Sequence, residues 1–369
     1  MGLMSGTSMD GIDAVLARVS DRGCDLKEHT TVQYPDEVAV SLRAIALGEK
    51  EDLHTVAVAH RAVGKAFASA VEQLLSIAGL HRGEIIAIGS HGQTVRHHPP
   101  SVSDENYTLQ IGDPATIAEV TGITTVADFR TQDLAAGGEG APLAPSFHAM
   151  QFGEAGKHRA IVNVGGISNA TLMSGREVVA GFDCGPGNTL LDSWVNEVRG
   201  ESYDAHGAWS AEHRVIDPLL MGLTEDPYFQ KRGPRSTGPE HFNLDWLKRH
   251  LTGDENPGDV QATLAELTAF AIALSLEEYV DDLEGVYVCG GGARNTDLMR
   301  RLGRRLAPHG ITLGTTDELG LDAEWVEASA WAWLAYARLR GIPANSPVVT
   351  GAAGPRILGT ITAAEHPEK

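Results

Sequence analysis

Two short stretches of this 369-residue chain place glycine, hydroxyl and carboxylate groups in a turn that follows an apolar run. Residues 6–13 read GTSMDGID, and residues 183–188 read DCGPGN. Backbone N–H groups and hydroxyls in such turns suit phosphate oxygens, and a carboxylate beside them suits a magnesium shell. For the first stretch alone an ordinary Gly/Ser/Asp hairpin is the favoured interpretation, but two such turns in one chain favour phosphate binding.

Asp183 is the carboxylate of the second stretch. It lies between a strand predicted over residues 178–182 and a Gly-Pro-Gly turn, and a helix is predicted from residue 189 to about residue 198. The amides of the turn and the dipole of the helix favour a phosphate there, with the carboxylate beside it. The alternative is a structural aspartate that caps the turn.

Two further predicted strands end in residues that suit a ligand. His91, Gln93 and Thr94 follow a fully apolar strand predicted at 85–89, and open α/β sheets bind ligands at the carboxyl ends of such strands. A structural imidazole is an equal alternative for His91. The glycines at 290–292 follow another apolar strand, where the missing side chains would let a helix N-terminus approach a flat ligand closely.

Two isolated charged residues stand out from their surroundings. Arg130 follows a strand predicted at 124–127 and precedes a Gly-rich stretch at 135–143, so it is well placed to hold a substrate carboxylate. A structural salt bridge is the alternative. Glu327 shares a helix face with Trp331, and a carboxylate on such a face usually has a specific partner. The alternative role for Glu327 is a contact with the helix dipole.

Composition sets limits on the class of protein. Hydrophobic residues make up 42% of the chain and charged residues 21%, which is ordinary for a globular protein, and the length allows two domains. The net charge of −20, without a basic run, argues against nucleic acid as a partner. Three cysteines without paired spacing favour a reducing cytoplasm. We expect no signal peptide, no membrane-spanning apolar run and no zinc site.

Hydrophobic periodicity predicts the elements that would position these residues. Strands at 2–4 and 12–17 should form an opening hairpin, and strands at 160–164 and 170–173 should repeat it. The other predicted elements are strands at 24–34 and 108–111, helices at 52–78 and 324–340, a capped helix after Asp113, a helix starting at Asn295, a mostly helical insertion at 201–251 and an amphipathic helix at 260–279.

The order of these turns resembles the actin/hexokinase/Hsp70 superfamily of two-domain ATP-handling proteins, and neither the P-loop motif nor the Rossmann fingerprint is present. Within that superfamily the chain is similar to the anhydro-N-acetylmuramic acid kinase family from residue 1 to about residue 362. The similarity rests on an ordered set of motifs: MSGTSMDGID, GSHGQTVRHHP, LQIGDPATIAEVTGITTVADFR, GGEGAPLAPSFH, NVGGISN, FDCGPGN, STGPEHF, ATLAELTA, CGGGARN, VEASAWAWLA and VTGA.

This resemblance implies an ATP-dependent enzyme of cell-wall sugar recycling. Water opens the 1,6-anhydro ring while O6 receives the γ-phosphoryl group of ATP, which yields N-acetylmuramic acid 6-phosphate and ADP. The family's catalytic aspartate corresponds to Asp183. Its implied substrate-binding residues are His91, Gln93, Thr94, Arg130 and Glu327. Its implied ATP-binding residues are Gly6, Thr7, Ser8, Met9, Asp10, Gly11, Ile12, Asp13, Asn163, Gly165, Gly166, Gly185, Gly187, Asn188, Gly290, Gly291, Gly292 and Asn295.

The resemblance also implies Mg²⁺ beside ATP, with Asp10 near the ion, a homodimer, a cytoplasmic location and no tightly bound structural metal. The expected fold is an α/β, actin-like sugar-kinase (ribonuclease H-like) fold of two domains with a central ATP and substrate cleft. The predicted N-terminal domain covers 1–134 and is joined by about 340–369, and the C-terminal domain covers 135–339 with an insertion at about 201–255.

Two departures from the family pattern are visible. Relatives carry several residues before the first motif glycine, so either the start lies further upstream or the first strand is shortened to 1–4. Cys184 replaces the usual threonine, which removes a hydroxyl at that position. Two rival functions are a kinase for levoglucosan, which has no carboxylate for Arg130, and an ATP-binding regulator or chaperone, for which we expect no room for a further binding domain.

Overall fold

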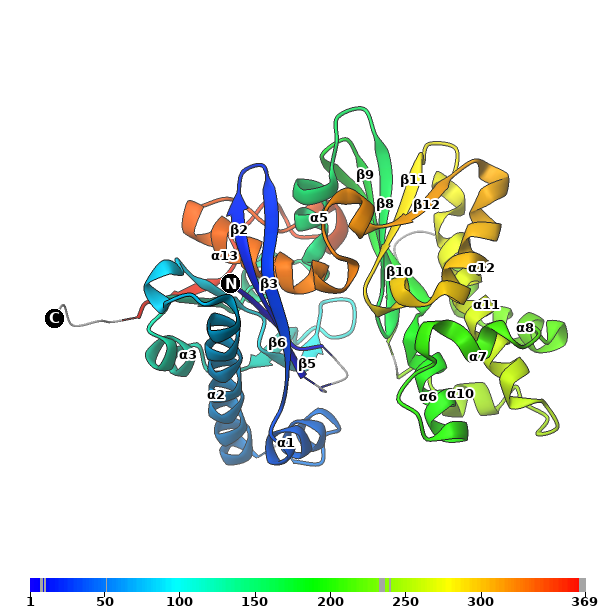
Figure 1. Ribbon diagram of the computed structural model, residues 1–369, viewed down its shortest axis with the longest axis horizontal. Helices are drawn as coiled ribbons and strands as arrows, with labels where there is room; N and C mark the ends of the chain where they lie inside the picture. Colours follow the sequence, from blue (N-terminus) through cyan, green and yellow to red (C-terminus); the bar gives the residue numbers. More distant parts are fainter. Residues whose placement is uncertain (7–8, 10, 51, 232–235, 239, 365–369) are drawn as a thin grey trace. The chain divides into compact units, whose positions relative to one another are not determined.

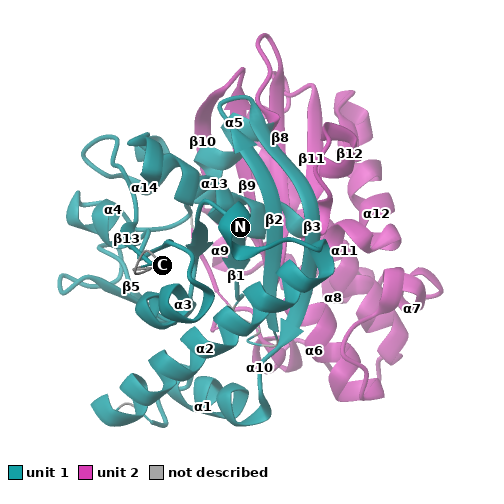
Figure 2. Cartoon of the chain, turned by 60° about the vertical axis from the view of Figure 1, so that its left-hand side comes forward, with its two compact units in different colours: residues 1–151, 325–369 teal, residues 152–324 magenta. Residues whose placement is uncertain are grey.

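The computed structural model describes residues 1–6, 9, 11–50, 52–231, 236–238 and 240–364. They form two compact units, which Figure 2 colours separately. Unit 1 consists of Met1–Gln151 and Trp325–Lys369, and unit 2 consists of Phe152–Glu324. Each unit has a mixed β-sheet with helices packed on it, so the predicted α/β class is confirmed. The domain boundaries predicted from the sequence remain a prediction.

The sheet of unit 1 has the strand order β13-β7-β4-β1-β2-β3. The predicted opening hairpin is present, because β1 and β2 pair antiparallel, with Leu3 opposite Ala14. β1 also pairs parallel with β4, and β4 pairs parallel with β7. The strands are β1 (Gly2–Met4), β2 (Gly11–Ser20), β3 (Gly23–Gln33), β4 (Ile88–Ser90), β7 (Thr125–Ala127) and β13 (Thr360–Thr362).

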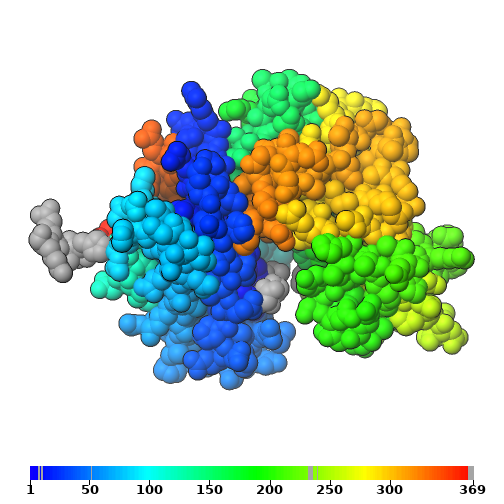
Figure 3. All heavy atoms as spheres, viewed as in Figure 1, coloured from blue at the N-terminus to red at the C-terminus, as the bar shows by residue number. Residues whose placement is uncertain are grey.

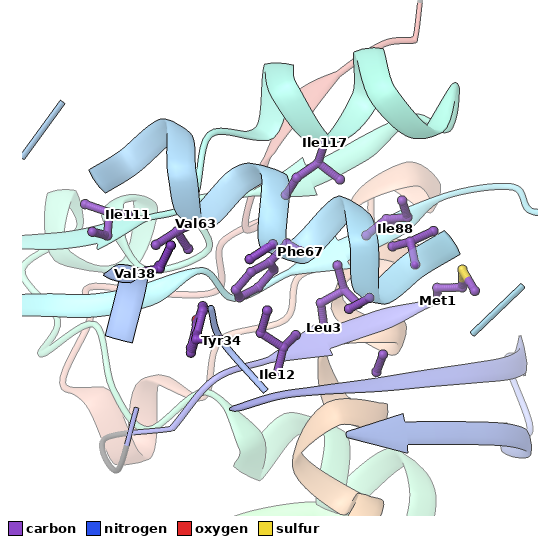
Figure 4. Packing of buried hydrophobic residues seen from close by; sticks show 14 of the residues in the cluster. Met1, Leu3, Ile12, Tyr34, Val38, Val63, Phe67, Ile88, Ile111 and Ile117 are labelled. Atoms are coloured by element: carbon purple, nitrogen blue, oxygen red, sulfur yellow. The ribbon is translucent and has the colours of Figure 1, made fainter. Parts of the chain in front are cut away.

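Helices cover both faces of this sheet. Ile12 and Ala14 of β2 belong to a core built around Phe67 of α2 (Leu53–Ala78), which Figure 4 shows together with Leu3 and Ile117. Val15, which points to the opposite face of the strand, packs against Ala328 and Ala332 of α13 (Val326–Arg340). The alternation of side chains along β2 thus fixes α2 on one face and α13 on the other.

Local capping signals set the helix ends in unit 1. The Asp52 side chain accepts a hydrogen bond from the Thr55 N–H at 2.9 Å, and Gly79 ends α2 in the left-handed region. Asp113 caps α3 in the same way, as predicted. The other elements of this part of the chain are α1 (Asp36–Ala46), β5 (Gln93–His98), β6 (Tyr107–Ile111), α3 (Pro114–Thr121), α4 (Thr131–Ala135), α5 (Ala144–Phe152) and α14 (Pro347–Thr350).

One strand differs from its prediction. The apolar run at 85–89 was expected to be a buried strand throughout, but β4 begins only at Ile88, and Ile86 is 86% exposed. The run follows a short 3₁₀ turn at Arg82–Glu84, so its first residues serve as a connection on the surface.

Unit 2 contains the second predicted hairpin, which lies in a sheet of strand order β10-β9-β8-β11-β12 (Figure 1). β8, β9 and β10 pair antiparallel, and β8 pairs parallel with β11, which pairs parallel with β12. The strands are β8 (His158–Val164), β9 (Ile167–Ser174), β10 (Glu177–Pro186), β11 (Gly285–Cys289) and β12 (Thr312–Thr315). The helices are α6 (Asn188–Arg199), α7 (Ala208–Ala211), α8 (Asp217–Thr224), α9 (Pro227–Gln230), α10 (Leu244–Lys248), α11 (Pro257–Leu276) and α12 (Thr296–Leu306). The insertion that carries α7 to α10 forms much of the surface drawn in green in Figure 3.

α11 is the central helix of unit 2. The predicted helix is present, but the prediction that it is amphipathic was wrong. No residue from Val260 to Leu276 is exposed, so the helix is not amphipathic in its surroundings. Its polar positions are buried against partners: the Thr268 hydroxyl donates to the Gly187 carbonyl at 3.1 Å, and Glu266 pairs with Arg301 at 2.9 Å. Pattern alone cannot distinguish such positions from a solvated face.

The same helix contradicts the expectation that no apolar run is long enough to span a membrane. Among the described residues, the helical stretch Pro257–Tyr279 is long and apolar enough to cross a membrane, with a mean hydropathy of 1.3. However, 72% of that apolar window is buried inside the structure, as expected for the core helix of a globular unit.

The packing of α13 on the sheet of unit 1 leads to a stability prediction. A Cβ atom on Gly89 would lie 2.0 Å from the carbonyl oxygen of Trp331, so helix and strand backbones are in direct contact. We expect Gly89→Ala to lower the free energy of unfolding by about 2 kcal/mol or more in urea denaturation. Gly83→Ala is the matched control, because nothing lies within 4 Å of its Cβ position, and its effect should stay within about 0.5 kcal/mol. Equal stability of the two variants would contradict this packing.

Candidate functional site

The side chain of Gln93 forms two hydrogen bonds to the opening turn of unit 1. The Ser5 hydroxyl donates to Gln93 Oε1 at 2.7 Å, and Gln93 Nε2 donates to the Gly6 carbonyl at 3.1 Å. Met9 adopts a left-handed conformation with φ of 54°, and its N–H donates to the Gly6 carbonyl. The sequence predicts Gln93 as a substrate-binding residue. In this structure its side-chain amide forms hydrogen bonds to the turn. Three predicted ligands of this turn, Thr7, Ser8 and Asp10, lie outside the described residues.

The residues after the turn begin β2, and their side chains have separate roles. Ile12 is fully buried in the core, so only its backbone can meet a ligand. Asp13 Oδ1 accepts a hydrogen bond from the Thr31 hydroxyl at 2.6 Å, and Gly11 pairs with β3.

Thr94, another predicted substrate-binding residue, lies in the β5–β6 hairpin. Its hydroxyl accepts a hydrogen bond from the Gln110 side chain at 3.2 Å.

Arg130, His91 and Trp331 form a compact group at the carboxyl ends of β4 and β7. Arg130 NH2 lies 2.9 Å from His91 Nε2, and Arg130 NH1 donates to the Gly140 carbonyl at 2.9 Å. The His91 ring packs on Trp331 with centroids 4.4 Å apart, and the Arg130 guanidinium lies 5.8 Å from the centroid of the Trp331 ring. The structure therefore brings together two residues that the sequence singled out separately.

Both partners of Arg130 are uncharged. Burial lowers the pKa of His91 to about 3, so the ring is neutral near pH 7 and Nε2 can accept a hydrogen bond from the guanidinium. Burial also lowers the pKa of Arg130 to about 10, while the nearby charges of Glu327 and Asp133 raise it, so Arg130 stays cationic. In the part of the chain that the structure describes, no carboxylate forms an ion pair with Arg130, and its buried Nε has no partner. This group is suited to an anionic ligand.

In unit 2, Asp183 lies within β10, which runs on to Pro186 and does not end at residue 182 as predicted. A segment far along the chain holds Asp183. The Ser236 hydroxyl and the Thr237 N–H each donate to Asp183 Oδ2 at 3.0 Å. The Tyr228 hydroxyl donates to the Asp183 backbone carbonyl at 2.7 Å. Both the carboxylate and its backbone are therefore fixed by residues more than 40 positions away.

The electrostatics of Asp183 are balanced between opposing effects. Burial is the largest influence and raises the pKa of this carboxyl above its ordinary value. The hydrogen bonds from Thr237 and Ser236 oppose it, because they favour the ionised form, and the charge of Glu240 acts in the same direction as burial. A carboxylate with a raised pKa that is still held by two donors is suited to accept a proton.

The turns at Gly165–Gly166 and Gly187–Asn188 interlock. The N–H groups of Gly187 and Thr189 both lie within hydrogen-bonding distance of the Gly166 carbonyl, and the Asn188 N–H donates to the Gly165 carbonyl at 2.8 Å. These three N–H groups already donate to carbonyl oxygens, so they are less able to bind the phosphate that the sequence predicts there. The dipole of α6 still favours negative charge at this place.

The three glycines at 290–292 differ in their surroundings. A Cβ atom on Gly290 would lie 2.3 Å from Asn163 Oδ1, and one on Gly292 would lie 2.3 Å from Val164 Cγ1, so these two allow the turn to pack on β8. Gly291 has more space, with Asn188 Nδ2 at 3.7 Å from its Cβ position. The Asn295 side chain caps α12 by accepting from the Leu298 N–H at 2.9 Å, as predicted for the start of that helix.

Other predicted residues have packing roles. Gly185 lies against α11, where its Cβ atom would be 3.1 Å from the Ala271 side chain. Cys184 is fully buried, so the side chain that replaces the usual threonine is in the core. Glu327 is exposed on the first turn of α13, although Trp331 on the same face is buried.

Sequence reasoning missed Tyr228 and Asp133. Tyr228 contacts Asp183 across 45 positions, and no local pattern indicates such a contact. Asp133 is fully buried beside Arg130, and a lone aspartate in a short helix gives no signal of burial. Ser236 and Thr237 begin the motif STGPEHF that contributes to the family resemblance, so part of that signal was available.

The contacts of Asp183 predict how its titration responds to mutation. Ser236→Ala removes a donor to the ionised carboxylate, so the pKa of Asp183 should rise further, as measured by carbon-13 NMR of the carboxyl carbon. Tyr228→Phe is the control, because this hydroxyl contacts the backbone carbonyl and not the carboxylate. A pKa of Asp183 that is unchanged or lower in Ser236→Ala would show that the hydrogen bond is absent in solution.

Among solved structures, the chain is similar to the activator of the 2-hydroxyisocaproyl-CoA dehydratase from Clostridium difficile with bound ADPNP. The two share 12% sequence identity over 92% of this chain and 95% of that chain, with a TM-score of 0.48. Because this score is below 0.5, the family assignment depends on the sequence matches alone.

The sequence matches are extensive. Residues 1–364 match the family described as Anhydro-N-acetylmuramic acid kinase. The chain is 49% identical over 363 residues to the anhydro-N-acetylmuramic acid kinase of Pseudomonas paraeruginosa, covering 98% of both chains. It is 45% identical over 361 residues to that of Nitrosomonas europaea, again covering 98% of both. The chain therefore belongs to the anhydro-N-acetylmuramic acid kinase family.

Proposed function

We propose that Asp183 is the general base of a coupled ring opening and phosphoryl transfer. Asp183 takes a proton from a water molecule whose oxygen attacks the anomeric carbon of 1,6-anhydro-N-acetylmuramic acid. The bond between C1 and O6 breaks, O6 attacks the γ-phosphorus of ATP, and ADP leaves. The products are N-acetylmuramic acid 6-phosphate and ADP.

The observation that carries this proposal is the way in which Asp183 is held. A general base must be positioned within hydrogen-bond reach of its water, and two donors at 3.0 Å on Oδ2 limit the rotation of the carboxylate. The raised pKa brings the base closer to neutral pH, where proton transfer is most effective. The family membership supports the choice of substrate.

We further propose that Arg130 binds the lactyl carboxylate of the sugar, with His91, Thr94 and Glu327 around the substrate. The support is the guanidinium described above, whose two hydrogen-bond partners are uncharged, since a guanidinium fork matches a carboxylate. For Gln93, the bonds to Ser5 and Gly6 favour an indirect role, in which it shapes the turn that faces the ligand.

We propose that ATP meets the backbone of the turn at 6–13 and of the turns at 165–166 and 290–292. Phosphoryl transfer depends mainly on positioning and on neutralisation of charge, and Mg²⁺ that accompanies ATP would supply the latter. Asp10, proposed to lie near the ion, is outside the described residues. Among the described residues no group of three or more His, Cys, Asp or Glu side chains could hold a metal ion.

A cytoplasmic location and a homodimer are further proposals. The three cysteines are free and buried, which is compatible with a reducing compartment. The homodimer rests on the family resemblance.

The proposal predicts the behaviour of Asp183→Asn. This variant keeps the shape of the side chain but removes the base, so turnover should fall by roughly two to four orders of magnitude in a coupled ADP assay. Calorimetry should show that ATP and sugar still bind. Asp259→Asn makes the same chemical change at the start of α11 and should keep normal turnover. Near-normal turnover of Asp183→Asn would mean that Asp183 is a structural or metal-shell residue.

A further inference from the structure

The carbonyl group that holds Arg130 belongs to a loop that is organised around one buried carboxylate. Asp133 is fully buried, and its Oδ2 accepts the Gly140 N–H at 2.9 Å. Its Oδ1 accepts Asn345 Nδ2 at 2.7 Å and the Thr350 hydroxyl at 2.9 Å. Asp133 therefore joins the loop to a segment near the C-terminus that lies more than 200 residues away.

The loop closes tightly on this carboxylate. A Cβ atom on Gly138 would lie 2.2 Å from Asp133 Oδ2, and the Gly138 N–H donates to the Asp133 carbonyl at 2.9 Å. Gly140 has a φ of 71°, in the left-handed region, which aims its N–H at Asp133 while its carbonyl accepts from Arg130. The position of the Gly140 carbonyl thus depends on Asp133.

We propose that Asp133 is a positioning residue that sets specificity for a sugar bearing a carboxylate. Through Gly140 it fixes NH1 of Arg130, while His91 fixes NH2. The guanidinium is then held at both ends by neutral acceptors in one orientation, with its charge available to a ligand. This inference rests on the proposed function, in which Arg130 binds the lactyl carboxylate.

The chemistry explains why a carboxylate is required at position 133. Three donors point at its two oxygens, and an ionised carboxylate can accept from all of them. An asparagine has one acceptor oxygen, so its NH₂ group would face either the Gly140 N–H or the pair of Asn345 and Thr350. A donor facing a donor displaces the loop, and displacement of the Gly140 carbonyl turns the guanidinium away from the plane that a bidentate carboxylate needs.

The test compares two sugars that differ only in the lactyl group: 1,6-anhydro-N-acetylmuramic acid and 1,6-anhydro-N-acetylglucosamine. Binding to the full-length enzyme is measured by calorimetry without ATP, so the readout does not depend on turnover. We expect Asp133→Asn to raise the dissociation constant for the muramic sugar by roughly ten- to a hundred-fold and to change that for the glucosamine sugar by less than about three-fold. Equal losses on both sugars, or no loss on either, would overturn the inference.

Thr350→Val is the matched control for stability. It removes one donor to Oδ1 but leaves the Gly140 bond in place, so it should lower the melting temperature without changing the ratio of the two dissociation constants. Arg130→Lys tests the proposed function on its own. If Arg130→Lys weakens both sugars equally, the role of Arg130 is wrong; if it is selective and Asp133→Asn is not, only the inference about Asp133 fails.

Gly138→Ala disturbs the same contact by another route and decides the matter if Asp133→Asn does not fold. The added methyl group would press on Asp133 Oδ2, so the same selective loss for the muramic sugar is expected. A Gly138→Ala enzyme that binds both sugars as the wild type does, or that loses both equally, would contradict the proposal.

Discussion

The two hydrogen bonds to Asp183 Oδ2 are the interaction on which the proposed chemistry of unit 2 depends. Burial alone would drive this carboxyl toward its neutral form, which cannot accept a proton, and the donors from Ser236 and Thr237 counter that effect. Both donors lie between α9 and α10 of the helical insertion, 53 and 54 residues after Asp183. α11 holds the chain that follows Asp183, because the Ser275 hydroxyl lies 3.3 Å from the Cys184 carbonyl and the Thr268 hydroxyl donates to the Gly187 carbonyl.

Unit 1 also has to keep a buried group ionised, but here the group is a cation. A cation near Trp331 is costly to bury, yet an ion pair would cancel the charge that a ligand needs. Neutral acceptors solve this, because the Gly140 carbonyl and the neutral His91 ring stabilise Arg130 without neutralising it. The contact between Gly89 and α13 places Trp331 against His91, so backbone packing and the electrostatics of the group are linked.

The sequence was sufficient for the parts of the fold that local rules govern. Both hairpins, the Asp113 cap of α3 and the Asn295 cap of α12 follow from turn and capping residues close in sequence. Contacts between distant residues were not accessible in this way. The hydrogen bond between Tyr228 and Asp183, the loop organised around Asp133 and the burial of Glu266 in α11 all depend on tertiary packing. The roles of Asp183 and Arg130 remain predictions from family resemblance that the geometry supports.

The central claim is that water attacks the anomeric carbon while O6 receives the phosphoryl group. A single turnover of the enzyme in oxygen-18 water, followed by immediate borohydride reduction to prevent exchange at O1, tests it most directly. If water attacks C1, mass spectrometry should find one oxygen-18 atom at C1 of the reduced sugar phosphate and none in the phosphoryl group. Label in the phosphoryl group or in free phosphate, with an unlabelled C1 oxygen, would contradict it.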